Sequence, residues 1–349
     1  MPWCLCALVV DTSSTLGCCV ACSKIPVSVL ICGLGSIGRR HLRHFRALGC
    51  GPIWAYRTGK ATLPDAGQPQ PDAVLHELTE ALAQKPDVVV VANPTALHVE
   101  TALAAVRAGC HVLIEKPLSH RREGIAELVA ETARLGRVVR VAQNLRFHPQ
   151  LQRLRQMLAT GQPLGQPLLA RAHIGGYLPD WHPWEDYHGS YAARRDLGGG
   201  SALTNIHELD YLTWLLGPAR RFAGFASPLH PLRTDVDEVA AFVLEHATGA
   251  LSVATLSLAH KPQARTLELS GAGGNASLDL LTGHLRLALA DGTVREEPPP
   301  PGFSLDDTYR AQAADFLAAL DGQPGVGATL AEAVHDLEIA LCIQSNSHD

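Results

Sequence analysis

A lysine and a histidine that are distant in the chain have the chemistry needed to polarise an oxygen and to exchange its proton. Lys116 lies in the motif E-K-P at 115–117, and His207 follows three glycines at 198–200 and begins the pattern H-x-x-D that ends at Asp210. An imidazole, with a pKa of about 6.5, exchanges protons near neutrality, whereas an ammonium, with a pKa of about 10.4, is better suited to steady an oxygen that gains negative charge. We therefore expect His207 to act as general acid/base and Lys116 to orient and polarise an alcohol oxygen.

Residues 27–40 carry a pattern that is typical of a dinucleotide-binding turn. The sequence VSVLICGLGSIGRR places Gly33, Gly35 and Gly38 in the spacing G-x-G-x-x-G between a β-branched run and a helical segment. The first glycine permits a tight turn, the second lets the backbone approach a pyrophosphate, and the third allows close helix packing. The phosphates are expected on the amides of the helix N-terminus.

The end of the second predicted strand, 53–56, bears on the choice of dinucleotide. Arg57 and Thr58 follow this strand, and no acidic residue occurs before Asp65. A carboxylate here would bind the ribose hydroxyls of NAD, whereas an arginine would pair with the 2'-phosphate of NADP. We expect NADP, with NAD as the alternative. Arg57 as an ordinary solvated cation stays open.

Composition limits the class of protein. The chain has 349 residues, which favours two domains at roughly 150 residues per domain. Its net charge is -5, from 29 basic and 34 acidic residues, and it has no long basic run, which argues against a nucleic-acid partner. No apolar stretch reaches the roughly 18 residues that cross a bilayer, so we expect no membrane association.

Cysteines are concentrated at the beginning of the sequence. Five of the nine lie in the first 22 residues, including C-x-C at 4–6 and C-x-x-C at 19–22. No histidine or second well-spaced pair completes a zinc site, and the segment lacks the basic start of a signal peptide. We predict an N-terminal extension over 1–24 that holds no metal. The other, dispersed cysteines indicate a reducing cytoplasm.

Strand and helix patterns alternate in the predicted first domain, 25–145. After the run that enters the glycine motif, strands are predicted at 53–56, 87–92, 111–114 and 138–142, and helices at 37–48, 74–82, 97–108 and 121–135. Strict alternation predicts right-handed crossovers and a doubly wound parallel sheet, a Rossmann domain. Ligands then bind beyond the carboxyl ends of the strands.

The pattern changes in the predicted second domain, 146–349. Helices are predicted at 149–159, 309–320 and 330–343, strands at 239–244, 250–258, 266–270 and 285–289, and an extended loop at 296–302. This domain is expected to be α+β with a large, mostly antiparallel sheet that binds substrate and forms oligomers. The last helix is expected to pack back on the Rossmann domain.

Three motifs together carry a family resemblance. The sequence NPTALH at 93–98 follows the third strand, E-K-P follows the fourth, and GGGSALTNIHELDY spans 198–211. From about residue 25 onward the chain resembles the Gfo/Idh/MocA family of glucose-fructose oxidoreductases and inositol dehydrogenases. The segment 176–187 resembles members linked to bacterial surface-sugar biosynthesis. The resemblance implies an NAD(P)-dependent oxidoreductase of a sugar, nucleotide sugar or polyol, working as a homo-dimer or homo-tetramer.

The motifs and the resemblance also imply the site residues. Those expected at the cofactor are Gly33, Gly35, Ser36, Ile37, Gly38, Arg57, Thr58, Asn93, Pro94, Thr95, His98, Glu115, Lys116 and Pro117. Aromatic faces beside polar donors suit a sugar ring. Those expected at the substrate are Arg146, His148, Tyr177, Trp181, His182 and His207. As alternatives, the loop aromatics could lie at an oligomer interface, and His98 could simply be a residue at the start of a helix.

One position departs from the family pattern. Members usually carry an aspartate three or four residues before the histidine, where this chain has Leu203 and Thr204. Thr204 and Asn205 are expected to assist by hydrogen bonding, and Asp210 lies on the same helix face as His207, where it either orients His207 or joins a structural network. Neither Thr204 nor Asn205 holds a negative charge, which leaves open a non-catalytic sensor of cofactor and sugar.

Overall fold

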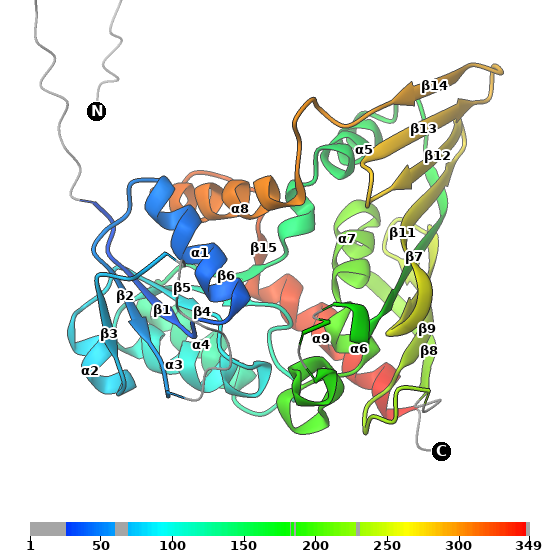
Figure 1. Cartoon of the computed structure of the whole chain (residues 1–349). Coiled ribbons are helices and arrows are strands. Elements are labelled where there is room, and N and C mark those ends of the chain that lie inside the picture. Colours follow the sequence, from blue (N-terminus) through cyan, green and yellow to red (C-terminus); the bar gives the residue numbers. More distant parts are fainter. Residues whose placement is uncertain (1–25, 60–68, 182, 185, 228–230, 347–349) are drawn as a thin grey trace, which may run out of the picture.

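The first sheet of the molecule is the parallel sheet that the sequence predicts. The computed structural model describes residues 26–59, 69–181, 183–184, 186–227 and 231–346. The sheet order is β15-β6-β5-β4-β1-β2-β3 (Figure 1). Its strands are β1 (Val29–Cys32), β2 (Ile53–Tyr56), β3 (Ala73–Leu75), β4 (Val88–Val91), β5 (His111–Glu115), β6 (Val139–Ala142) and β15 (Ala328–Thr329). Every residue of β1 and β4 is buried because helices cover both faces.

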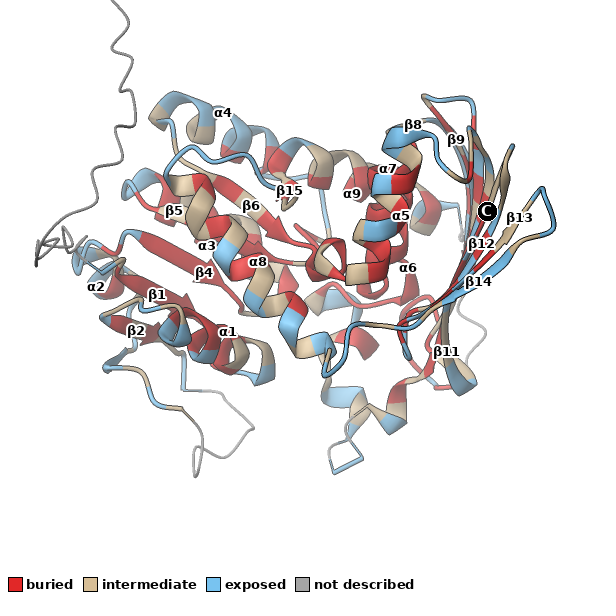
Figure 2. Cartoon of the chain, turned by 90° about the horizontal axis from the view of Figure 1, so that it is seen from above, coloured by how far each residue is buried: buried red, intermediate tan, exposed pale blue. Residues whose placement is uncertain are grey.

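Helices from both ends of the chain cover this sheet. They are α1 (Ser36–Ala47), α2 (Leu78–Ala83), α3 (His98–Arg107), α4 (Ile125–Leu135), α8 (Leu305–Leu320) and α9 (Leu330–Ser345). One face packs on α1 and α8, and the other on α3, α4 and α9 (Figure 2). The chain therefore returns to its first domain after completing the second.

Two sequence predictions need correction here. The predicted helix at 74–82 is instead the short strand β3 followed by α2, because Val74 and Leu75 pair with β2 and extend the sheet. The predicted second domain, 146–349, was expected to return to the first domain only through its last helix. However, β15 pairs antiparallel with β6, and Phe316 of α8 packs in the core of the first sheet.

The second sheet has eight strands in the order β14-β13-β12-β11-β7-β10-β9-β8, all antiparallel except the pair β7 and β10. Its strands are β7 (Pro167–Tyr177), β8 (Ala219–Ser227), β9 (Val239–His246), β10 (Leu251–Ser257), β11 (Ala259–Gly271), β12 (Gly274–Asp279), β13 (His284–Leu289) and β14 (Val294–Glu297). The two-domain α/β and α+β fold class is thereby confirmed. Strands β7, β8 and β12 were not predicted, and β14 overlaps the predicted loop.

Three helices connect the two sheets. They are α5 (Pro149–Thr160), α6 (Ser201–Thr204) and α7 (His207–Leu216). All ten residues of α7 are buried, because this helix lies against β7 and β10 of the second sheet while also contacting α5 and α9. A histidine at the start of α7 is thus held firmly between the two halves of the molecule.

Candidate active site

The glycine turn after β1 has the shape that a dinucleotide requires. Gly33 has a φ of +100°, and a Cβ there would lie 2.6 Å from the carbonyl oxygen of Ala92. A Cβ on Gly38 would lie 1.9 Å from the carbonyl oxygen of Gly33, so the helix packs directly on the turn. A Cβ on Gly35 would meet nothing within 4 Å. The turn therefore leaves open space at the N-terminus of α1, where a pyrophosphate fits.

His98 links two turns at the carboxyl edge of the first sheet. Its Nδ1 lies 2.8 Å from the carbonyl oxygen of Pro117, and its Nε2 lies 2.9 Å from that of Asn93. Its side chain is almost wholly buried, and burial lowers its pKa. His98 was expected at the cofactor, but both of its ring nitrogens face backbone carbonyls inside the protein, so its imidazole is not free to bind a ligand. His98 instead holds together the turns that carry Asn93 and the E-K-P motif.

Glu115 is also held from within the protein. Its Oε1 lies 2.7 Å from Nε2 of His41 on α1, and its Oε2 accepts a hydrogen bond of 3.2 Å from the backbone N–H of Lys116. His41 is fully buried and was not predicted. The Lys116–Pro117 peptide bond is cis. The helix that begins the dinucleotide site therefore also fixes the strand end that carries the lysine.

Lys116 and His207 converge on one site from different domains. The Nζ of Lys116 donates a 2.8 Å hydrogen bond to the backbone oxygen of Thr204, three residues before His207. The pKa of His207 is lowered well below its ordinary value, first by burial and then by the nearby charges of Lys116 and Arg265. The imidazole is therefore neutral at pH 7, the form that accepts a proton.

Two residues that act on His207, one by contact and one by its charge, were missed by sequence reasoning. Gln143, which directly follows β6, places its Oε1 2.6 Å from Nδ1 of His207. Arg265 of β11 donates to both carboxylate oxygens of Glu208, at 2.7 and 3.0 Å. Glu208 is fully buried, so this ion pair fixes a positive group beside the imidazole without leaving the charge uncompensated. No local sequence signal marks either contact, because the partners are far apart in the chain.

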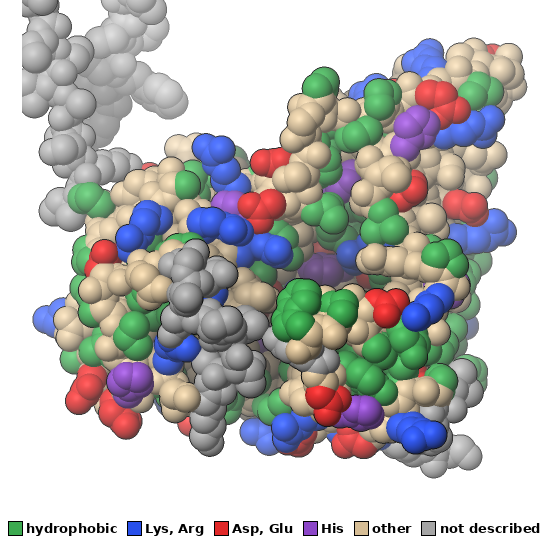
Figure 3. Space-filling model, in the orientation of Figure 1, with side chains coloured by type: hydrophobic (Ala, Val, Ile, Leu, Met, Phe, Trp, Pro, Cys, Tyr) green, Lys and Arg blue, Asp and Glu red, His purple; other side chains and the backbone are tan. Residues whose placement is uncertain are grey.

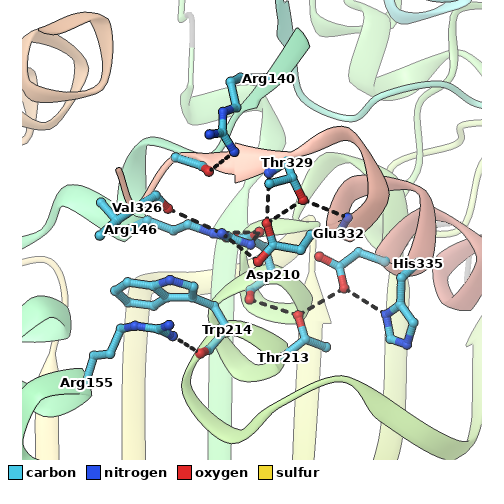
Figure 4. A network of polar contacts seen from close by, with 12 residues as sticks. Arg140, Arg146, Arg155, Asp210, Thr213, Trp214, Val326, Thr329, Glu332 and His335 are labelled. Atoms are coloured by element: carbon cyan, nitrogen blue, oxygen red, sulfur yellow. Dashed lines mark hydrogen bonds and ion pairs between the residues drawn. The ribbon is translucent and has the colours of Figure 1, made fainter. Parts of the chain in front are cut away.

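Arg146 and Asp210 form a buried ion pair instead of contributing to the substrate site (Figure 4). The Nε and Nη2 of Arg146 donate to the carboxylate of Asp210 over 2.7 to 3.1 Å, and its Nη1 contacts Glu332 at 3.1 Å. Only 1% of Arg146 is exposed. The expectation that Arg146 lines the sugar site is therefore wrong. Asp210 points to this arginine, so of the two roles predicted for it the structure shows the structural network and not the orientation of His207.

The ion pair belongs to a network that joins α7 to α9. Thr213 donates to Oδ1 of Asp336 at 3.0 Å, and His335 lies 3.4 Å from the same oxygen (Figure 4). Arg155 lies over the ring of Trp214, 4.4 Å from its centroid. Because α9 covers the first sheet and α7 carries His207, this network ties the proposed proton carrier to the Rossmann domain.

His148 is a buried helix cap. Its Nδ1 accepts a 3.2 Å hydrogen bond from the backbone N–H of Gln150, at the start of α5, and its ring stands edge-on to Phe303 at 5.1 Å. Burial and the charge of Arg265 lower its pKa to about 4. With 0% exposure this residue does not line the substrate site, so the expectation that it does is wrong.

His148→Asn should weaken the dependence of stability on acid pH. The folded-state pKa of about 4 lies below the ordinary 6.5, so the unfolded chain binds the extra proton and stability falls as pH falls from 6.5 to 4. Asparagine keeps the cap, and removing the titration should reduce this fall by about 3 kcal/mol. Denaturant unfolding between pH 4 and 7 measures it. The exposed His284→Asn is the control, and equal slopes for the wild type and His148→Asn would contradict the prediction.

The two polar residues before His207 turn inward. The Oγ1 of Thr204 is buried without a hydrogen-bond partner among the described residues, and Asn205 lies 3.4 Å from Oγ of Ser201. The visible contribution of Thr204 is its backbone carbonyl, which accepts from Lys116. Assistance by either side chain at the substrate stays a prediction.

Tyr177 and Trp181 line a cavity of about 880 Å³ at the end of β7. Its other lining residues are Asp180, His260, Lys261, Pro262 and Gln263. The ammonium of Lys261 lies 3.8 Å from the centroid of the Tyr177 ring and 3.2 Å from Asp180. His182 lies outside the described residues. Figure 3 shows the face of the molecule that is hollowed between the two domains.

The first sheet is a Rossmann sheet with an open glycine turn, and Lys116 at its edge lies near His207 of the second domain. This combination is typical of dinucleotide-dependent oxidoreductases. Residues 27–143 match the model described as an oxidoreductase family with an NAD-binding Rossmann fold, and residues 151–277 match the GFO/IDH/MocA C-terminal domain. The chain belongs to the Gfo/Idh/MocA oxidoreductase family.

Relatives of known name cover part of the chain. D-Glucoside 3-dehydrogenase of Escherichia coli is 35% identical over 139 residues, 39% of this chain and 37% of that protein. Inositol 2-dehydrogenase of Agrobacterium fabrum is 34% identical over 197 residues, 54% of each chain. The matches thus span between about a third and just over half of these relatives.

Solved structures extend the likeness in fold to nearly the whole chain. Levoglucosan dehydrogenase, in complex with NADH and levoglucosan, has a TM-score of 0.81 at 20% identity and covers 93% of this chain and 97% of that one. UDP-N-acetylglucosamine 3-dehydrogenase of Acidithiobacillus ferrooxidans has a TM-score of 0.75 at 21% identity, covering 93% and 98%. The described part of the chain contains no helix with the length and hydropathy of a membrane span.

Proposed function

We propose that this protein transfers a hydride between a nicotinamide dinucleotide and a secondary alcohol of a sugar, nucleotide sugar or polyol. The convergence of Lys116 and His207 carries the proposal, since the two residues come from different domains yet lie within electrostatic reach of each other. The glycine turn supports the dinucleotide, and the named relatives act on glucosides and inositol. The aromatic cavity at Tyr177 and Trp181 supports a sugar ring.

In this mechanism the nicotinamide, when bound, accepts or supplies the hydride. His207, held neutral by burial and by two nearby cations, takes the hydroxyl proton during oxidation and returns it during reduction. Lys116 donates a hydrogen bond to the same substrate oxygen and steadies its developing charge. The residues proposed for the cofactor remain Gly33, Gly35, Ser36, Ile37, Gly38, Arg57, Thr58, Asn93, Pro94, Thr95, Glu115, Lys116 and Pro117.

A panel of sugars, polyols and UDP-sugars, each with NAD and NADP, tests the function. The expected result is growth of the reduced-nicotinamide absorbance with at least one substrate, and loss of that signal in His207→Asn. Quenching of protein fluorescence by the cofactor, measured in parallel, reports binding. Cofactor binding without turnover on any substrate would reject catalysis.

That outcome would support the second candidate, a sensor that binds cofactor and sugar. Among the described residues no carboxylate lies within ion-pair distance of Lys116, whose ammonium contacts a backbone carbonyl instead. A carbonyl does not supply the full negative charge that a family aspartate would. The presence of both Lys116 and a neutral His207 favours the enzyme.

We propose NADP as the preferred cofactor, because Arg57 directly follows β2, where an arginine can pair with the 2'-phosphate. The backbone N–H of Arg57 donates to Leu75 and keeps the residue at the end of that strand. Arg57→Ala should lower kcat/KM for NADP by about 10- to 100-fold, the size of a lost charge-assisted hydrogen bond, and leave NAD little changed. Arg134→Ala, on the exposed face of α4, is the control. A similar loss with both cofactors would reject a contact with the 2'-phosphate.

We propose that a second copy of the chain covers the open face of the second sheet. On this face Phe225 of β8 is 73% exposed, and Val243 of β9 and Leu251 of β10 are exposed nearby. Phe225→Glu should shift the molar mass in solution from dimer or tetramer to a smaller species, as measured by light scattering. Val129→Glu on α4 is the control. A monomeric wild type would reject the interface.

We also propose a cytoplasmic location. The four cysteines among the described residues, Cys32, Cys50, Cys110 and Cys342, are all free thiols. Such thiols are typical of a reducing compartment.

A further inference from the structure

We propose that Gln143 is a positioning residue that fixes the tautomer of His207 and so presents its Nε2 as the proton acceptor. This inference rests on the proposed function and adds how the proton carrier of that site is controlled. Gln143 contacts His207 and is not among the residues proposed to bind substrate or cofactor.

The turn after β6 holds Gln143 rigidly. Its side chain is 2% exposed, its backbone N–H donates to the carbonyl of Val141 at 2.9 Å, and its own carbonyl accepts from the N–H of Arg146 at 3.1 Å. Arg146 is in turn fixed by its ion pair with Asp210. The amide is therefore placed by the first sheet on one side and by the buried ion pair on the other.

The contact between Gln143 and His207 decides which ring nitrogen carries hydrogen. The Oε1 of Gln143 lies 2.6 Å from Nδ1 of His207, and an amide oxygen only accepts hydrogen bonds. With the amide in this orientation, the hydrogen lies on Nδ1. A neutral imidazole has one such hydrogen, so Nε2 keeps a free lone pair, and no described residue forms a hydrogen bond with it.

The choice of a glutamine also fits the charges around the ring. Lys116 approaches from the end of β5 and Arg265 from β11, and both oppose protonation of His207. The nearest carboxylates on α7 are committed elsewhere, Glu208 to Arg265 and Asp210 to Arg146. A neutral amide thus orients the imidazole without adding the negative charge that would stabilise its protonated form.

Nitrogen-15 NMR of the histidine rings tests the tautomer in the full-length protein without any substrate. His207 is assigned as the ring signal missing from His207→Asn. We expect hydrogen on Nδ1 and a bare Nε2 at neutral pH. Hydrogen on Nε2, or a charged ring, would overturn the proposal. Because this readout needs no turnover, its failure is separate from failure of the proposed function.

Two variants at this position extend the test to turnover. Gln143→Glu places a carboxylate beside Nδ1, favours the charged ring and should move the acid limb of kcat/KM for alcohol oxidation upward by one pH unit or more. Gln143→Met, of similar length but without an acceptor, should lower kcat more than 10-fold at every pH without moving that limb. Cofactor binding at wild-type strength shows that each variant is folded. An unshifted acid limb in Gln143→Glu, or wild-type kcat in Gln143→Met, would overturn the positioning role.

Discussion

Lys116→Met is expected to reduce turnover about 10²- to 10³-fold, the usual cost of removing a preorganised donor to a developing oxyanion. The ammonium group is held by the carbonyl of Thr204 beside His207, so methionine keeps the length of the side chain and removes the donor. Cofactor affinity should change far less, because the glycine turn after β1 is untouched. Steady-state kinetics in both directions and fluorescence titration of the cofactor separate these effects.

The matched control for this variant is Lys85→Met, a lysine between α2 and β4. It should retain wild-type kinetics. Turnover of Lys116→Met within threefold of the wild type would show that the lysine does not polarise the substrate. Loss of cofactor binding together with turnover would instead assign Lys116 to the dinucleotide alone.

Asp210→Ala is expected to lower the free energy of unfolding by about 3–5 kcal/mol, because it leaves Arg146 charged and buried. Arg146 would keep only contacts of its Nη1, with Glu332 at 3.1 Å and with the backbone oxygen of Val326 at 3.3 Å. Denaturant unfolding at neutral pH measures the loss. The double variant Arg146→Met with Asp210→Leu should recover most of it, since replacing both members of a buried ion pair by apolar residues is often nearly neutral.

The control for Asp210→Ala is Glu131→Ala, which breaks the exposed ion pair with Arg134 on α4. It should leave the unfolding midpoint where it is. If Asp210→Ala were as stable as the wild type, the network of Figure 4 would not hold α7 against α9.

These two predictions concern the same structural arrangement. Arg146 lies in the turn directly after Gln143, and Asp210 lies one helical turn after His207. The ion pair therefore fixes both ends of the Gln143–His207 contact. Removing it should disturb proton transfer as well as folding, whereas Lys116→Met should disturb only chemistry.

Local sequence predicted most strands of the first sheet, and its motifs proposed Lys116 and His207, which the structure brings close together. Strands buried on both faces require continuous apolar runs, so the run 87–92 identified β4 without knowledge of its neighbours. A Cβ on Gly33 or Gly38 would clash with the backbone, so this turn requires glycine at both positions, and the turn is the proposed dinucleotide site. In the second domain, β7 was missed because its buried positions, such as Ala170 and Ala172, are small and give a weak alternating signal.

The sequence by itself determined the fold class and the glycine turn, because those features depend on residue type and short spacing, and its motifs together with the family resemblance marked Lys116 and His207 as the candidate chemistry. Only the tertiary structure decided which polar residues face the site. Arg146, His148 and His98 have side chains suited to ligands, yet packing buries them against Asp210, Gln150 and backbone carbonyls. Gln143, His41 and Arg265 gain their roles from partners 57 to 74 residues away. Burial and long-range pairing arise from how the sheets and helices pack, and short sequence patterns do not contain that information.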